Sequence, residues 1–145
     1  MIALLQRVSD ASVKVSGAEI ARINRGVLAL VGIEKGDDMQ KADKLVHKML
    51  GYRIFEDEVG KMNLSLRDIQ GEMLLVPQFT LAADTKSGMR PGFSAAASPL
   101  EGEKWFNYVV TKSQAEIDTV QTGQFGADMK VSLLNDGPVT FWLQV

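Results

Sequence analysis

The sequence predicts an α/β protein with a three-layer β/β/α arrangement, mixed sheets and two main helices. Short apolar or alternating stretches, which are typical of strands, outnumber the stretches with helical spacing, and only two of the latter are long. These two stretches do not alternate with single strands. We therefore expect both helices to cover one face of the sheet layers, and not a doubly wound parallel sheet. At 145 residues the chain is long enough for a substantial core and is predicted to form one domain, residues 1–145.

The first part of the chain is predicted to contain four strands. Residues Met1–Val8 and Ala11–Gly17 flank the short link Ser9–Asp10, and the second of them alternates valine with polar residues. A third, short strand is predicted at Ala18–Ile23. Residues Gly26–Ile33 form a continuous apolar run between turn residues, which indicates a strand buried on both faces.

The period changes at Asp37–Gly51, where apolar residues recur at helical spacing: Met39, Ala42, Leu45, Val46, Met49 and Leu50. Asp37, followed by Gln40 three residues later, resembles a capping box. Gly51 suits the position just after the helix. A helix is therefore predicted here.

The remaining elements follow from the same patterns. A hairpin is predicted from Tyr52–Phe55 and Met62–Leu66, and a long strand with an internal proline at Glu72–Leu81. The second helix is predicted at Leu100–Ile117. Residues Asp128–Val145 are predicted to form two strands joined by a turn.

Composition excludes several classes of protein. There is no cysteine, which excludes disulfides and thiolate chemistry, and His47 is the only histidine, which argues against zinc. No G-x-S-x-G elbow, Walker A sequence or G-x-G-x-x-G occurs. No cofactor, no bound metal and no membrane or DNA partner are expected, and a cytoplasmic protein without a signal peptide is predicted. The net charge of −2 fits a local contact with nucleic acid better than a long backbone track.

Three stretches are candidates for function. The first is Pro77–Leu81, where Pro77 cannot donate to a sheet ladder and so indicates an edge or a bulge. In a strand, Gln78 and Thr80 would share one face and Phe79 would lie on the other. A half-exposed strand without a functional role also fits this pattern.

The second stretch is Lys86–Phe93, inside a polar loop predicted at Ala82–Pro99 that is longer than compact domains usually contain. Gly88 and Pro91 flank Met89 and Arg90 and restrict the backbone, so that the arginine would be held in place. An ordinary surface loop is an equally good interpretation. Taken without any family, the chain could be a dimeric binding module for a small anionic ligand anchored by Arg90.

The third stretch is Asn135–Thr140. A hairpin turn followed by an edge-strand proline would explain it. However, an X-Pro bond is placed in cis at a cost of only about 0.5–1 kcal/mol. Gly137 has no Cβ and Pro138 has no N–H, so together they could present a slim, stiff ridge of backbone to a ligand.

Four motifs together resemble the D-aminoacyl-tRNA deacylases: "QRV" at 6–8, "QFTLAADT" at 78–85, "RPGF" at 90–93 and "NDGPVTFW" at 135–142. The resemblance covers essentially the whole chain. It implies hydrolysis of the ester that joins a D-amino acid, or glycine, to the 3′ end of tRNA, as chiral proofreading in translation. It further implies a homodimer, the β/β/α fold and no metal or other cofactor.

The resemblance also implies roles for residues. Gln78, Phe79 and Thr80 would line the catalytic pocket for the aminoacyl adenosine. Gly137 and Pro138 would form a cis pair that enters the pocket of the partner subunit and rejects L-amino acids.

Further residues would support these two groups. Arg7 would help to hold the Gly-Pro pair, and Met129 would lie near the adenosine, while Arg90 and Pro91 would contact the substrate. The chain departs from the family pattern at two positions, where Pro77 and Gly92 stand in place of serine. A serine hydroxyl therefore cannot act at either position.

The chemistry needs no strong nucleophile, because an aminoacyl ester is already activated. Backbone amides of Phe79 and Thr80 are candidates to stabilise the developing oxyanion. No base stands near Thr80 in the sequence, so its hydroxyl is expected to position the substrate and not to attack it. The resemblance implies that the substrate's own ribose 2′-hydroxyl assists.

Overall fold

The computed structural model describes residues 1–145, and six of its strands form one mixed sheet. The order is β2-β1-β3-β6-β7, with β8 paired to β1. The pairs are antiparallel except for β3–β6 and β6–β7, which are parallel. The strands are β1 (Ile2–Val15), β2 (Ala18–Ile23), β3 (Gly26–Gly32), β6 (Glu72–Pro77), β7 (Val120–Thr122) and β8 (Met129–Gln144).

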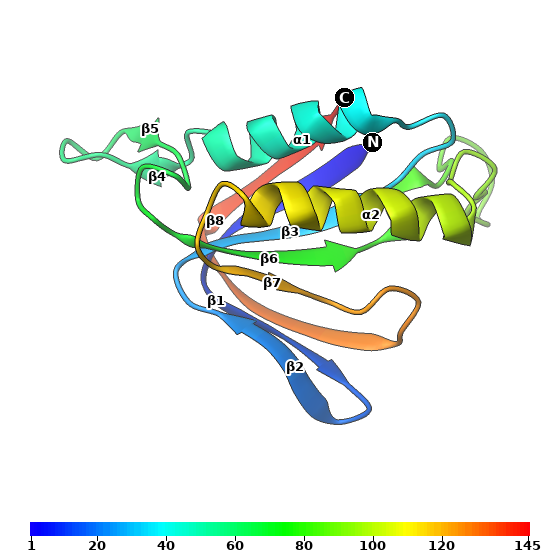
Figure 1. The fold of residues 1–145 in the computed structure, drawn as a ribbon, viewed down its shortest axis with the longest axis horizontal. Helices are drawn as coiled ribbons and strands as arrows, with labels where there is room; N and C mark the ends of the chain where they lie inside the picture. The colour runs from blue at the N-terminus through cyan, green and yellow to red at the C-terminus, as the bar shows by residue number, and fades with distance from the viewer.

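One long strand turns this sheet into two layers. The first half of β1, residues 2–8, pairs with β3, whereas residues 11–15 pair with β2. Strand β8 follows β1 along both halves, and Figure 1 shows these strands curving away beneath β3 and β6. The predicted class, an α/β fold of two sheet layers and a helix layer, is confirmed, and both sheet layers are parts of the same hydrogen-bonded sheet.

Strands β3 and β6 are covered on both faces, as the apolar run at Gly26–Ile33 predicted. Val27 and Ala29 belong to the core on the helix side, whereas Leu28 between them belongs to the inner core between the sheet layers. In β6, Met73 faces the helices and Leu74 faces the inner core. The alternation of Cβ direction along a strand thus supplies two cores from one apolar run.

Two helices form the third layer. Helix α1 (Met39–Gly51) and helix α2 (Pro99–Gln114) lie side by side over the same face of the sheet (Figure 1). Seven residues on the sheet-facing sides of α1 and α2 are buried in the helix-side core: Ala42, Leu45, Val46, Met49, Leu50, Phe106 and Val109. Both predicted helices are confirmed. The predicted apolar face of α1 is buried except for Met39, which is 53% exposed, and α2 ends at Gln114 and not at Ile117.

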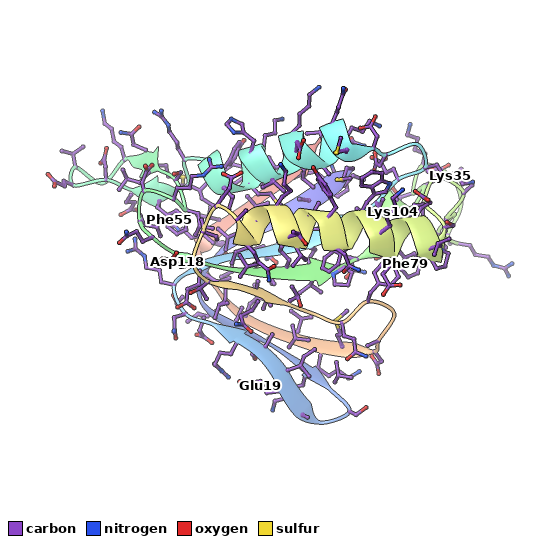
Figure 2. All side chains as sticks on the ribbon, in the orientation of Figure 1. Glu19, Lys35, Phe55, Phe79, Lys104 and Asp118 are labelled. Atoms are coloured by element: carbon purple, nitrogen blue, oxygen red, sulfur yellow. The ribbon has the colours of Figure 1, made fainter.

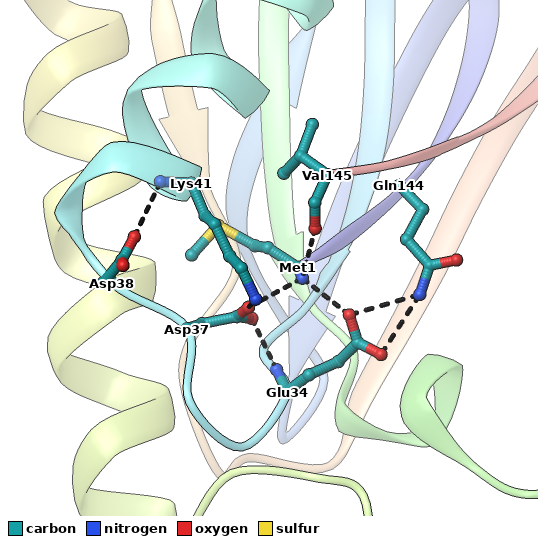
Figure 3. Close-up of polar contacts among 7 residues, drawn as sticks. All are labelled: Met1, Glu34, Asp37, Asp38, Lys41, Gln144 and Val145. Carbon is teal, nitrogen blue, oxygen red and sulfur yellow. Dashed lines mark hydrogen bonds and ion pairs between the residues drawn. The ribbon is translucent and has the colours of Figure 1, made fainter.

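The start of α1 differs from the predicted capping box. Asp38 is the N-cap, and its carboxylate accepts from the Lys41 N–H at 2.9 Å. Asp37 is buried and accepts instead from the Met1 ammonium at 2.9 Å and from the Glu34 N–H at 2.7 Å (Figure 3). Gly51 is the last helical residue and not the residue after it. Asp37 does not cap the helix because its carboxylate is engaged by Met1, the residue before β1.

Several strand boundaries also differ from the expectations. Each end of the chain forms one strand and not two, and no hairpin closes at Asn135–Gly137. The short strand β7 was not predicted. Strands β4 (Phe55–Glu56) and β5 (Met62–Leu64) confirm the predicted hairpin. No helix has the length and the apolar character needed to cross a bilayer.

The close approach of β3 to β6 generates a testable prediction. A Cβ at Gly26 would overlap the carbonyl group of Glu72 on the neighbouring strand. We expect Gly26→Ala to lower the free energy of unfolding by about 1–3 kcal/mol, because one of two paired backbones must shift. Urea unfolding measures this.

Gly51→Ala is the matched control. A Cβ there meets only the Arg67 guanidinium at an ordinary 3.5 Å, and the residue ends a helix. This change should leave stability unchanged or raise it by up to about 1 kcal/mol. Equal losses in the two variants would contradict the account of the β3–β6 contact.

Candidate active site

A cavity of about 410 Å³ opens at the end of the molecule where β3 and β6 finish. Its wall is mostly apolar. It includes four phenylalanines, from the segment after β6, the following loop, α2 and the turn after β7: Phe79, Phe93, Phe106 and Phe125. Gln78 and Ser98 are among the few polar residues of the lining. The cavity thus suits a flat apolar group with a small polar part.

The segment after β6 places Gln78 and Phe79 in the cavity wall, whereas Thr80, the next residue, is not among the lining residues. Pro77 closes β6, and the Gln78 N–H donates to the Val31 carbonyl at 2.8 Å. The chain then enters a single 3-10 turn, η1 (Phe79–Ala82). The expected continuous strand through Leu81 is therefore wrong, and Gln78 and Thr80 do not share a strand face.

The 3-10 turn orients the side chains of Gln78 and Thr80 and the backbone N–H groups of Phe79 and Thr80. The Gln78 amide Nε2 donates to Thr80 Oγ at 2.5 Å, which leaves the threonine proton free to donate elsewhere. The first bond of the turn runs from the Leu81 N–H to the Gln78 carbonyl, 3.2 Å. The N–H groups of Phe79 and Thr80 precede that bond, at the end of the turn where donors lack partners inside the helix.

The aromatic ring of Phe79 is 59% exposed although it is large and apolar. Its only aromatic neighbour is Phe93, with ring centroids 5.1 Å apart. Figure 2 shows Phe79 at the same end of the molecule as Lys35. An apolar surface left open beside a cavity is what a ligand would cover.

Phe125 and Gly102 form part of the cavity wall, although neither was among the predicted site residues. Phe125 sits in the turn between β7 and β8, where the Gly123 N–H donates to the Leu75 carbonyl at 2.8 Å. A Cβ on Gly102 of α2 would come within 3.3 Å of the Phe125 ring. The fit of a glycine against a ring could not be inferred from spacing, since the two residues meet only in the folded chain.

A second group of candidate residues lies in β8. Gln6 pairs with Thr140 and Val8 pairs with Asn135, so residues 136–139 bulge opposite the single residue Arg7. Gly137 has φ +139°, and the Gly137–Pro138 peptide bond is cis. The bulge is closed by the side chain of Asn135, which accepts from the Val139 N–H at 2.9 Å.

Arg7 holds this bulge from inside the molecule. Its guanidinium donates to the Asp136 carbonyl at 2.9 Å and to the Ile54 carbonyl at 2.7 Å, and the residue is only 7% exposed. Pro138 and Gly137 themselves are exposed. The structure therefore brings Arg7 and the Gly-Pro pair together, in a bulge and not at the expected hairpin tip.

Within one chain, the Gly137–Pro138 bulge lies apart from the cavity beside Gln78 and Phe79. Arg7 pairs with Val27 of β3, whereas the end of β6 pairs with Val31. Four residues of strand correspond to about 13 Å. Neither Gly137 nor Pro138 lines the cavity.

The other candidates lie outside the cavity lining. Arg90 and Pro91 are exposed in the loop that the Asp84–Gly92 bridge closes. Met129 packs against the inner core, and its sulfur accepts from the Gln124 N–H at 3.3 Å. Met129 thus supports the turn that carries Phe125 instead of facing the cavity.

The cavity contains no acid or base that stands out electrostatically. Six groups have a pKa displaced from the ordinary value, and none lines it: Glu19, Arg22, Asp57, Asp68, Tyr108 and Lys112. No three His, Asp or Glu side chains are grouped to hold a metal ion. The cavity offers aromatic walls, and beside it lie the backbone donors of the η1 turn and the Gln78–Thr80 amide–hydroxyl pair.

Comparison with known proteins adds independent information. The model of the D-Tyr-tRNA(Tyr) deacylase family matches residues 4–144. The chain is 59% identical to the D-aminoacyl-tRNA deacylase of Aeromonas hydrophila and 58% identical to that of Erwinia tasmaniensis, each over 100% of both chains.

Solved structures agree with this fold. A structure described as c-Myc DNA Unwinding Element Binding Protein aligns over 100% of this chain and 99% of its own, with a TM-score of 0.96 and 38% identity. A probable eukaryotic D-amino acid tRNA deacylase aligns over 99% of this chain and 98% of its own, with a TM-score of 0.79 and 16% identity, which shows the fold alone.

The contacts of Arg7 with the bulge predict that this residue contributes strongly to stability. Arg7→Met removes both charged hydrogen bonds and leaves two inward carbonyls without a donor, so we expect the free energy of unfolding to fall by about 1.5–3 kcal/mol. Arg22→Met is the control, since Arg22 pairs with Glu19 on the surface, where water screens the ion pair, and its loss should lower stability much less. Urea unfolding at one fixed protein concentration compares them. Equal effects would show that Arg7 does not anchor the bulge.

Proposed function

This chain belongs to the D-Tyr-tRNA(Tyr) deacylase family, and on that premise we propose that the cavity beside Gln78 and Phe79 receives the aminoacylated 3′ end of tRNA. The protein is a D-aminoacyl-tRNA deacylase, a hydrolase acting on the ester bond of D-aminoacyl-tRNA. The observation that carries the placement of the site is the free donor end of the η1 turn beside an aromatic cavity.

The aromatic walls fit the terminal adenine. Phe79, Phe93 and Phe125 provide exposed or half-buried rings around the cavity, and stacking on aromatic rings is a usual way to hold an unpaired base. The alternative of a small anionic ligand anchored by Arg90 is less well supported, because Arg90 does not line the cavity.

Catalysis would rest on position and backbone donors. Water adds to the ester carbonyl carbon, the bond to the ribose 3′ oxygen breaks, and a proton goes to that oxygen, which releases free amino acid and tRNA. The N–H groups of Phe79 and Thr80 would donate to the carbonyl oxygen as it gains negative charge, a contribution of several kcal/mol in comparable sites. The neighbouring ribose 2′-hydroxyl of the substrate would assist the proton transfer.

Chiral selection would need a second copy of the chain. The exposed Gly137–Pro138 bulge lies about 13 Å along the sheet from the cavity of its own subunit. We propose a homodimer in which this bulge enters the partner's cavity. There its rigid backbone would occupy the space of an L side chain, while D-amino acids and glycine would pass. We propose that this activity is cytoplasmic, because charged tRNA is its substrate.

Thr80 is proposed to position the substrate. Its hydroxyl accepts from Gln78 at 2.5 Å, and His47, the only histidine, is on the exposed face of α1 and absent from the cavity. We expect Thr80→Ala to lower kcat about 10–100-fold, far less than the loss of about 10⁶-fold that follows removal of a true nucleophile. Thr80→Ser should restore most of the rate.

Mass spectrometry of the enzyme quenched during turnover is the second measurement. No aminoacyl adduct on Thr80 is expected. A trapped adduct, or complete loss of activity in Thr80→Ala with the fold intact, would refute the positioning role.

Subunit mixing tests the shared site. We expect Thr80→Ala and Pro138→Ala homodimers to be impaired in D-ester turnover or in rejection of L-esters. A mixed dimer, isolated with two different tags, would hold one site with both changes and one with neither. Because of the intact site, it should regain D-selective hydrolysis at about half the wild-type rate. If Thr80 and Pro138 of one chain instead served the same site, every site in the mixed dimer would carry one change, and activity would not recover.

A further inference from the structure

We propose that the outer face of α1 is a docking surface for the phosphate backbone of the tRNA arm that adjoins the aminoacylated end. Four basic side chains there line an open groove of about 600 Å³ together with Asp43, Gln144 and Val145: Lys41, Lys44, His47 and Lys48. We call this surface the α1 groove. The inference rests on the proposed function, because it assumes that the substrate is a tRNA held by its 3′ end.

Helical spacing places these cations in one row. Lys41, Lys44 and Lys48 are separated by three and four residues and so lie on one face of α1. Seven residues of helix rise about 10 Å. That length spans about three phosphates of one strand at roughly 3.4 Å per nucleotide.

The carboxylate that lines the α1 groove, Asp43, and the neighbouring Asp37 already have partners. Asp43 accepts from the Tyr108 hydroxyl at 2.9 Å and pairs with Lys112 at 3.4 Å. Asp37 is buried against the Met1 ammonium, and Lys41 adds a contact to it at 3.2 Å.

In contrast, Lys44 and Lys48 are exposed and make no ion pair within 4.0 Å. His47, also exposed, adds a ring that can donate a hydrogen bond. The groove therefore has unneutralised positive charge, although the whole chain has a net charge of −2.

The α1 groove and the cavity share no lining residue, but a hydrogen bond and one step of the chain connect them. Ile33 lines the cavity, and the adjacent Glu34 accepts from the Gln144 amide of the groove at 3.1 Å (Figure 3). From that junction α1 leads away from the end of β3 across the sheet (Figure 1). An RNA whose 3′ end occupies the cavity could thus meet Lys41 first and Lys48 last.

The test compares two double variants with the same loss of charge. Lys44→Gln/Lys48→Gln removes the two free cations of the α1 groove. Lys14→Gln/Lys61→Gln removes two exposed cations that make no ion pair and lie on β1 and in the β4–β5 turn. Each protein is assayed with D-tyrosyl-tRNA and with D-tyrosyl-adenosine, which lacks the arm, over a range of KCl concentrations.

We expect the α1 groove variant to have a KM for D-tyrosyl-tRNA raised roughly tenfold at 0.1 M salt, and a salt slope smaller by about two. Its kcat, and its kinetics with D-tyrosyl-adenosine, should match the wild type. Lys44→Arg/Lys48→Arg should restore the KM, since phosphate contacts need charge more than side-chain shape. The control variant should bind as the wild type does.

Three outcomes would overturn the proposal. The two double variants could raise the KM for D-tyrosyl-tRNA equally, neither could raise it, or the α1 groove variant could lose as much activity with D-tyrosyl-adenosine as with D-tyrosyl-tRNA. Binding of uncharged tRNA, measured by filter retention, separates this proposal from the catalytic one. If wild-type protein failed to hydrolyse either ester, the proposed function would fall. In that case, weaker binding of uncharged tRNA by the α1 groove variant alone would still show that the α1 groove binds tRNA. Unchanged binding would show that it does not.

Discussion

The double-sided burial of β3 and β6 is the constraint on which the rest of this molecule depends. Val27 and Leu28 are neighbours in sequence, yet one contacts the helices and the other contacts the curved half of the sheet. Neither face of these strands can therefore hold a polar site without losing core. On these two strands a cavity can open only at the strand ends, and the candidate cavity lies where β3 and β6 finish.

The same constraint explains why the backbone is so prominent at the site. The chain leaves the buried sheet at Pro77 and turns at once, which exposes the amide groups of Phe79 and Thr80 at the start of a 3-10 turn. An ester that is already activated can be hydrolysed by such donors with accurate placement. The absence of a strong base in the cavity lining is consistent with this chemistry.

The bulge in β8 shows how a long strand can present an exposed feature without ending. Two residues of β1, Gln6 and Val8, continue the ladder on either side of the bulge. The buried guanidinium of Arg7 satisfies backbone carbonyls that leave the ladder, in the Asp136 segment and at Ile54. Because the ladder resumes at Thr140, the exposed Gly137–Pro138 pair is held between two lengths of regular strand.

The sequence by itself determined the elements whose signals are local. The period of apolar residues identified both helices and the doubly buried strand, and the four motifs identified the family, because each depends on spacing along the chain. Only the tertiary structure decided that Asp37 binds the Met1 ammonium, that Gly102 makes room for Phe125, and that Asn135–Thr140 is a bulge opposite Arg7. Gly102 and Phe125 are 23 positions apart, Met1 and Asp37 are 36 apart, and Arg7 and Asp136 are 129 apart. Local patterns hold no information on which of these distant groups will meet. The 3-10 turn after Pro77 was missed for the same reason, since the partner that ends β6 is the Val31 carbonyl on another strand.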